Sequence, residues 1–295
     1  MNKKANIIYD NIKLFYGTHQ KSKNDMSNKL REDIIINIIN GTISNEWFSD
    51  PQWNTLRMGV FKFLHSITDY HSVAAIKKAG RGNHSDFSIN FNINQSEIKT
   101  KNIEWKYGAK KVEDCPQWVS PMKPSQYLDQ SFEEYFYNYH LDKIVKDNDK
   151  PPVEVYLKEI HSDKPKCMEE YQMAYYKGAR GSSKYTGEKS DIDYYKMCKD
   201  VSNNAIKKFI EISNLNIPKL NEYLYNTQMD KIYMCCKDGE ITMDVPNKED
   251  YTIDESSIKK TKNQYVGKTV SGRTIKILLR WKNGNGIAFP AFQIK

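Results

Sequence analysis

Apolar residues recur at helical spacing through much of the first 80 positions of the chain. The segment "SDPQWNTLRMGVFKFLHSI" (49–67) also carries a start signal, because Asp50 can cap a helix that has Pro51 in its first turn. The N-terminal part is therefore predicted to be helical. The residues that share helical faces are Ile7, Ile8, Ile12 and Phe15, then Leu30, Ile34, Ile35 and Ile38, then Leu56, Val60, Leu64 and Ile67.

The pattern changes after "GRGNH" (80–84) to a strict alternation of apolar and polar residues. The segment "DFSINFNI" (86–93) has the period of two that is typical of a half-buried strand. A second extended run ends at Tyr107, and Asn94 with Gln95 can form a turn between the two runs. The sequence therefore predicts a β-hairpin or two adjacent strands in this region.

Helical spacing returns at 125–147, 165–177 and 190–213, with a basic Gly/Ser-rich loop over 177–187. After Pro218 the chain changes to short apolar runs between turn residues, which indicate strands. We therefore expect a boundary near residue 215. Residues 1–215 would hold the helices and the main core, and residues 216–295 a β-rich segment for DNA recognition or dimerisation.

The composition supports a globular protein with an anionic partner. The chain has 295 residues, 39% of them hydrophobic, which is enough for a core in one large domain or two small ones. Its net charge is +8, and the positive residues are spread from end to end. A polyanion such as nucleic acid is the partner that this charge favours.

Cysteine, histidine and apolar patterns exclude several other classes. The five cysteines include no C-x-x-C pair and the six histidines no H-E-x-x-H, so a zinc site is not expected. No Gly-rich phosphate loop of the P-loop type occurs. The N-terminus lacks the apolar region of a signal peptide, and no run approaches the roughly 20 apolar residues that span a bilayer. We expect a cytoplasmic protein in a reducing compartment, with no membrane partner.

Two Glu-x-Lys triplets lie close together, at Glu97–Lys99 and at Glu104–Lys106. Cutting a phosphodiester needs carboxylates that hold a divalent metal, an activated water and a cation for the developing charge. One Asp on a strand and Glu-x-Lys on its neighbour can supply these groups, because the period of a strand puts Glu and Lys on one face. Asp86, at the start of the alternating run, is within hairpin reach of both triplets.

The flanking residues favour the second triplet. Polar residues surround Glu97, whereas Ile103, Trp105 and Tyr107 interleave with Glu104 and Lys106, as expected of a central strand with a packed back face. In one regular strand the two triplets would face opposite sides, so only one can face Asp86. We therefore choose Glu104 and Lys106. The alternative is a salt-bridged surface strand, because Glu-x-Lys is common in a Lys-rich chain.

Asp86, then Glu104-x-Lys106, then Gln117 downstream resembles the PD-(D/E)XK nuclease superfamily, over roughly residues 50–140. The resemblance implies an α/β (α+β) restriction-endonuclease-like core, with a mixed sheet flanked by helices. The chain length and the β-rich C-terminal segment are similar to those of type II restriction endonucleases or viral nucleases of that superfamily. The motif is degenerate, and this chain departs from it because no Pro precedes Asp86 in "NHSD".

The resemblance also implies roles. Asp86 and Glu104 would hold Mg²⁺, with the Trp105 carbonyl as a further ligand, and Lys106 would orient the attacking water or stabilise the phosphorane charge. Gln117 would position Lys106 or a phosphate, although Gln is more often polar surface. An acid from the preceding helices would complete a two-metal site, with Glu46 and Asp50 as candidates, although Asp50 already has a capping role.

Three basic stretches are candidates for DNA contacts. They are "GRGNH" with Arg81, the 177–187 loop, and Arg280, Trp281 and Lys282. Each has a structural alternative. The first would be a plain turn, the second a solvated linker, and the third a buried Trp281 whose basic neighbours extend to solvent. Asn283-Gly284 beside that last stretch is a hairpin signal. The predicted DNA-binding residues are Arg81, Lys177, Arg180, Lys184, Arg280, Trp281 and Lys282.

These observations together predict a Mg²⁺-dependent endonuclease that cleaves double-stranded DNA, at a specific sequence, as in a restriction system. A homodimer would let two sites cut the two strands. The first alternative is a non-catalytic DNA-binding protein derived from a nuclease fold, or a viral structural protein. The second is a nuclease that acts on RNA.

Overall fold

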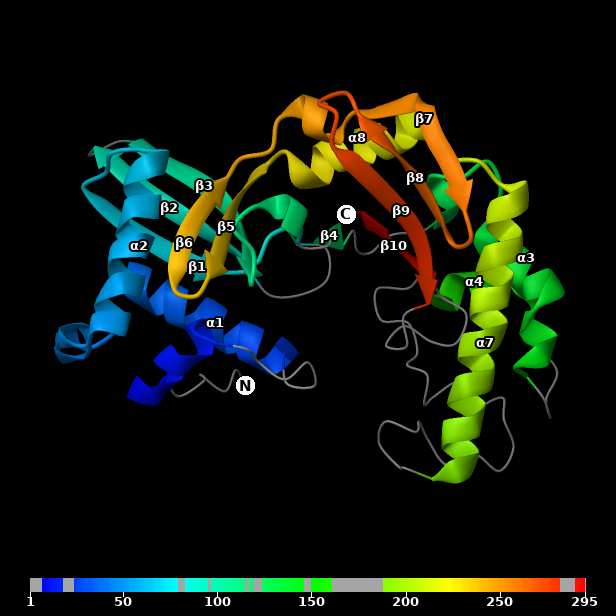
Figure 1. Cartoon of the computed structure of the whole chain (residues 1–295), viewed down its shortest axis with the longest axis horizontal. Helices are drawn as coiled ribbons and strands as arrows, with labels where there is room; N and C mark the ends of the chain where they lie inside the picture. The colour runs from blue at the N-terminus through cyan, green and yellow to red at the C-terminus, as the bar shows by residue number, and fades with distance from the viewer. Residues whose placement is uncertain are drawn as a thin grey trace. The chain divides into compact units, whose positions relative to one another are not determined.

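The computed structural model forms two compact units, each with its own sheet (Figure 1). The first unit contains Met1–Pro116 and Asn226–Asn247, and the second contains Gln117–Tyr225 and Lys248–Lys295. The residues that the structure describes are 7–17, 24–78, 83–94, 97–114, 117–118, 124–145, 150–160, 188–281 and 290–294.

The first unit is built on a five-stranded mixed sheet in the order β1-β2-β3-β5-β6. Strand β3 pairs antiparallel with β2 and parallel with β5, and the outer pairs are antiparallel. This confirms the predicted hairpin and a mixed α/β architecture with helices beside the sheet. The strands are β1 (Ser72–Lys77), β2 (Phe87–Asn94), β3 (Glu97–Tyr107), β5 (Lys231–Lys237) and β6 (Glu240–Asp244).

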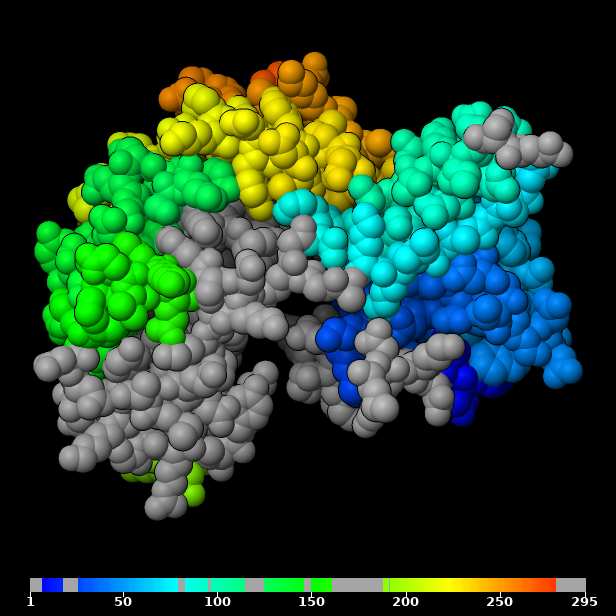
Figure 2. Space-filling model, turned by 180° about the vertical axis from the view of Figure 1, so that it is seen from behind, coloured from blue at the N-terminus to red at the C-terminus, as the bar shows by residue number. Residues whose placement is uncertain are grey.

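Helices α1 (Asn24–Ile39) and α2 (Pro51–Ile67) pack against this sheet, α1 on β1 and α2 on β6. Asp50 caps α2 as predicted, accepting hydrogen bonds from the backbone nitrogens of Gln52 (2.8 Å) and Trp53 (3.1 Å). Figure 2, seen from behind, shows blue atoms of the N-terminal part directly against cyan atoms, in agreement with the contact of α1 with β1. Among the described residues, the 3-10 helices of this unit are Tyr9–Phe15, Asn45–Ser49 and Val112–Asp114, whereas Lys248–Tyr251 belongs to the second unit.

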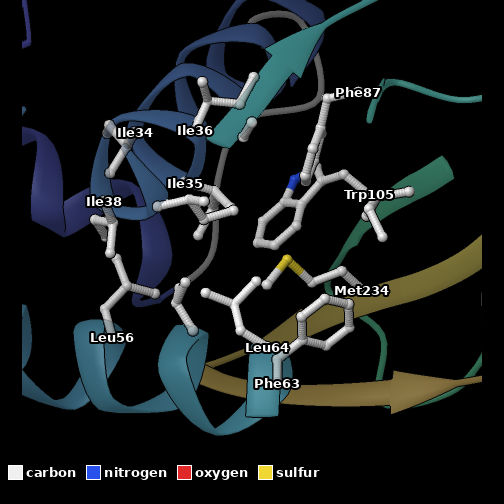
Figure 3. Packing of buried hydrophobic residues seen from close by; sticks show 14 of the residues in the cluster. Ile34, Ile35, Ile36, Ile38, Leu56, Phe63, Leu64, Phe87, Trp105 and Met234 are labelled. Atoms are coloured by element: carbon white, nitrogen blue, oxygen red, sulfur yellow. The ribbon is translucent and has the colours of Figure 1, made fainter. Parts of the chain in front are cut away.

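One face of the first sheet forms the main core. Alternate residues of β2, β3 and β5 point into it, which explains the period of two in the sequence. The isoleucines of α1 and the apolar stripe of α2 fill the space between helices and sheet (Figure 3). The residues labelled there are Ile34, Ile35, Ile36, Ile38, Leu56, Phe63, Leu64, Phe87, Trp105 and Met234.

The second unit has an antiparallel five-stranded sheet in the order β4-β10-β9-β8-β7. Strands β9 and β10 pair on either side of the predicted Asn283-Gly284 turn, which itself lies outside the described residues. The strands are β4 (Gln117–Trp118), β7 (Ile253–Thr261), β8 (Gln264–Thr269), β9 (Thr274–Trp281) and β10 (Pro290–Ile294).

The helices of the second unit only partly follow the predicted pattern. The helix predicted over 190–213 is confirmed as α7 (Lys189–Ile212), whereas 165–177 lies outside the described residues. The helix predicted over 125–147 is much shorter, because Ser131 caps α3 (Phe132–Tyr139), with 3-10 turns at Pro124–Gln126 and Leu141–Lys143 beside it. Of the helices that the structure describes, none combines the length and apolar character needed to cross a bilayer. The remaining α-helices in the part of the chain that the structure describes are α4 (Val153–Ile160) and α8 (Ile217–Gln228).

The division into units differs from the single boundary expected near residue 215. The segment after that point is rich in strands, but it serves both sheets: β5 and β6 join the first unit and β7–β10 the second. The physical reason is the parallel pairing of β5 with β3, which brings the chain back to the middle of the first sheet. Local sequence patterns carry no signal for a pairing at this separation along the chain.

Candidate active site

A single long strand carries both Glu-x-Lys triplets. Strand β3 runs from Glu97 to Tyr107, so residues of opposite parity face opposite sides of the sheet. Ile103 and Trp105 point into the helix-covered core, which leaves Glu104 and Lys106 on the other face. The first triplet lies at the exposed start of the strand, where Glu97 accepts a hydrogen bond from the Asn94 amide (3.2 Å). The parity that separated the two triplets in the sequence is therefore confirmed.

The backbone places Asp86 directly opposite Glu104. The Asp86 N–H donates to the Ile103 carbonyl (2.9 Å), and its Oδ2 accepts a hydrogen bond from the Trp105 N–H (2.8 Å). The carboxylate is thus anchored to the residue between Glu104 and Lys106. Asp86 extends the register in which Phe87 pairs with Ile103, so it shares the face of Glu104. Asp86, Glu104 and Lys106 are therefore brought together, as predicted.

The two carboxylates have different electrostatic surroundings. Burial and the nearby negative charge of Glu104 raise the pKa of Asp86 to about 6, although the Trp105 N–H and two lysines oppose this shift. Burial also disfavours ionised Glu104, but the positive charges of Lys106 and Lys231 outweigh it and hold the pKa of Glu104 below its usual range. Lys106 Nζ lies 2.6 Å from Glu104 Oε1. Glu104 is therefore the stably ionised member of the pair.

Lys231 is a member of the site that sequence reasoning missed. It is the first residue of β5, where the parallel register sets it beside Asn102, two residues before Glu104. Its amine lies 3.1 Å from Glu104 Oε2 and donates to the His84 carbonyl (2.6 Å). The side chain is only 4% exposed, and this burial lowers its pKa. Lys231 thus joins the strand of Glu104 to the segment that precedes Asp86.

Glu32 on α1 is the second missed residue. Burial, followed by the negative charge of Asp86, raises its pKa to about 7, and Lys77, whose amine is 3.8 Å away, opposes the shift. The candidates for the extra acid in the sequence were instead Glu46 and Asp50. Glu46 is exposed, and Asp50 is used by the α2 cap and by the Tyr9 hydroxyl (2.8 Å). Glu32 has no distinguishing sequence pattern, because it lies in a charged run, Arg31-Glu32-Asp33, that resembles a solvated part of α1.

The other predicted residues belong to the second unit or lie outside the described residues. Gln117 belongs to β4 of the second unit, while Asp86, Glu104 and Lys106 belong to the first. Arg280 and Trp281 end strand β9, also in the second unit. The predicted DNA-binding residues outside the described residues are Arg81, Lys177, Arg180, Lys184 and Lys282.

The oxygen donors at this site suit Mg²⁺. Within the described part of the chain, no group of three or more His, Cys, Asp or Glu side chains has the arrangement of a metal site. Mg²⁺, however, often takes one or two carboxylates together with water and substrate phosphates. The Trp105 N–H points to Asp86, and the N–H and C=O of a strand residue point to the same side, so the Trp105 carbonyl is directed there too. Asp86, Glu104 and this carbonyl therefore form a fitting donor set.

Comparison with known proteins adds no family assignment. No protein-family model matches the chain, and no curated protein matches it either. The site consists of two interacting carboxylates, Asp86 just before β2 and Glu104 on β3, with two lysine amines at Glu104.

Proposed function

We propose that this protein is a Mg²⁺-dependent endonuclease that hydrolyses phosphodiester bonds of double-stranded DNA, on a restriction-endonuclease-like core. The observation that carries the proposal is the anchoring of the Asp86 carboxylate to the N–H of Trp105, between Glu104 and Lys106. This contact makes Asp and Glu-x-Lys one constellation on one sheet face, as expected from the resemblance to PD-(D/E)XK nucleases. The mixed sheet with helices on its other face agrees with such a core.

The residues divide the proposed chemistry between them. Asp86, Glu104 and the Trp105 carbonyl would hold Mg²⁺, which when bound supplies Lewis acidity and makes water a better nucleophile. Lys106 places a cation beside Glu104, where it can orient the attacking water or meet the charge that develops on the phosphate. Lys231 contacts Glu104 Oε2, the carboxylate oxygen that Lys106 does not contact, and so keeps Glu104 ionised and oriented. Glu32 supplies a further acid whose charge state is linked to that of Asp86.

Charge supports the choice of substrate. The net charge of +8 favours a polyanion, and the carboxylate–lysine set is suited to a phosphodiester. Cleavage of both strands of a duplex would follow most simply from a homodimer with two equivalent sites. We include sequence-specific cleavage in the proposal because of the resemblance to type II restriction endonucleases.

Plasmid cleavage by the purified protein tests the proposal. Supercoiled plasmid, single-stranded DNA and RNA are each incubated with Mg²⁺, with Mn²⁺ and with a chelator, using wild type, Asp86→Asn and the control Asp10→Asn at an exposed Asp10–Lys13 pair. We expect plasmid cleavage that needs the metal, is lost in Asp86→Asn and is kept in Asp10→Asn. DNA binding without cleavage in either metal would favour the non-catalytic DNA-binding protein, and cleavage of RNA alone would favour the RNA nuclease.

A further inference from the structure

A third lysine, Lys78, reaches the face of the candidate site from the edge of the sheet. Its backbone N–H donates to the Asp86 carbonyl (2.9 Å), which sets it opposite Asp86 just beyond the end of β1. Its amine donates to Asn102 Oδ1 on β3 (2.6 Å). Because β2 lies between β1 and β3, the Lys78 side chain crosses β2 near Asp86.

The amine of Lys78 lies on the same sheet face as Glu104. Asn102 precedes Glu104 by two residues on β3, so the two side chains point the same way. The Asn102 amide donates in turn to Asp230 Oδ2 (3.0 Å). This second hydrogen bond fixes the orientation of the amide and directs its carbonyl oxygen to Lys78.

Lys78 differs from the other two lysines on this face in its partners. Lys106 and Lys231 are both ion-paired with Glu104. Among the described residues, Lys78 has the Asn102 amide as its side-chain partner and forms no ion pair with a carboxylate. An ammonium group has three N–H donors, and Asn102 takes one of them. Lys78 therefore presents a partly buried positive charge, held in place, with donors left for an anion.

We propose that Lys78, held by Asn102, binds a backbone phosphate of the DNA next to the scissile position. This inference rests on the proposed function, because it assigns a substrate contact to the same sheet face. Lysine contacts to phosphates position a nucleic acid without reading its sequence, and each adds to the salt dependence of binding. A half-buried amine that is already oriented loses less side-chain freedom on binding than a fully exposed one.

DNA binding over a salt series tests this contact. Dissociation constants for a duplex are measured with Ca²⁺ in place of Mg²⁺ for wild type, Lys78→Met, Lys78→Arg and the control Lys99→Met. Lys99 lies on β3 opposite Phe91, whose side chain is in the core. Lys99 therefore points to the face of β3 opposite the one that carries Glu104. We expect Lys78→Met to weaken binding about 3- to 10-fold and to lower the slope of log K against log salt by about 1. Lys78→Arg and Lys99→Met should stay close to wild type.

The outcomes separate this inference from the proposed function. If Lys78→Met binds DNA with the affinity and salt slope of wild type while wild type cleaves plasmid, the phosphate contact is refuted and the nuclease stands. If the slope falls in Lys78→Met but no metal supports cleavage, the contact with a backbone phosphate stands, whereas the nuclease and the scissile position beside that phosphate fail. Wild type that neither binds nor cleaves DNA refutes both. Lys78→Gln, which removes the charge but keeps a polar N–H donor, replaces Lys78→Met if that variant does not fold.

Discussion

At the scale of single residues, Asp86 and Glu104 are held by different kinds of partner. Asp86 is fixed by backbone hydrogen bonds, whereas Glu104 is fixed by the amines of Lys106 and Lys231. The pKa values consequently separate, to about 6 for Asp86 and below the usual range for Glu104. Two acids whose environments separate their pKa values are a common feature of catalytic sites, though ion-pair networks also produce it.

The raised pKa of Glu32 predicts a pH-dependent loss of stability. Its folded pKa is about 7, against 4.5 for the free side chain. Between these values the unfolded chain gives up the proton while the folded chain keeps it, so stability is full below about pH 4.5 and falls as pH rises to about 7. Without divalent metal, the unfolding free energy of Glu32→Gln relative to that of wild type should rise by on the order of 2 kcal/mol from pH 5 to pH 8.

Urea unfolding at several pH values measures this effect. Glu46→Gln serves as the control, because Glu46 is an exposed acid in the same N-terminal region. The difference in unfolding free energy between Glu32→Gln and wild type should grow with pH, and that between Glu46→Gln and wild type should stay flat. A constant difference for Glu32→Gln would show that its carboxyl has an ordinary pKa.

At the scale of elements, local patterns predicted what local contacts determine. The alternation after Asp86 gives β2, the parity within β3 separates the two triplets, and Asp50 with Pro51 starts α2. Each of these features depends on neighbours in the sequence, through side-chain period or capping. The face that joins Asp86, Glu104 and Lys106 could therefore be predicted before the fold was known.

Features that depend on distant contacts could not be predicted in the same way. Lys231 reaches Glu104 only because β5 pairs parallel with β3, 127 residues along the chain. Glu32 approaches Asp86 only because α1 packs on β1. The helix predicted over 125–147 is interrupted because Leu128 bridges to Leu215 and Asp129 binds the Asn214 backbone (2.8 Å), contacts that replace helical hydrogen bonding.

The cap of α2 predicts an effect on stability that is separate from catalysis. Asp50→Ala removes the acceptor for the backbone nitrogens of Gln52 and Trp53 and for the Tyr9 hydroxyl. The melting temperature should fall, while metal-dependent cleavage below that temperature should equal that of wild type. Asp50→Asn, which can still cap, should lie between the two in melting temperature. A folded Asp50→Ala protein without cleavage would place Asp50 in the active site after all.

At the scale of the whole molecule, the first unit is completed by a later part of the chain. Strands β5 and β6 follow most of the second unit in sequence. Strand β5 nevertheless pairs with the part of β3 that contains Glu104. The candidate site therefore takes residues from both segments of the unit. A chain stopped at residue 215 lacks Lys231 and leaves β3 as an exposed edge strand.

Two truncated chains test this organisation. A chain of residues 1–247 contains every element of the first unit, whereas one of residues 1–215 lacks β5 and β6. Thermal unfolding of both chains is monitored by circular dichroism, and their resistance to limited proteolysis is compared. We expect a cooperative transition of the first unit in 1–247 and none in 1–215. A cooperative, protease-resistant 1–215 chain would contradict the dependence of the first unit on β5.

The most direct test of the central claim compares the two triplets of β3 in plasmid cleavage with Mg²⁺. Glu104→Ala removes a carboxylate from the site face, and Glu97→Ala removes one from the exposed start of the same strand. We expect Glu104→Ala to lower the cleavage rate by about 10²-fold or more and Glu97→Ala to keep the wild-type rate. Full activity in Glu104→Ala, or its loss in Glu97→Ala alone, would contradict the account.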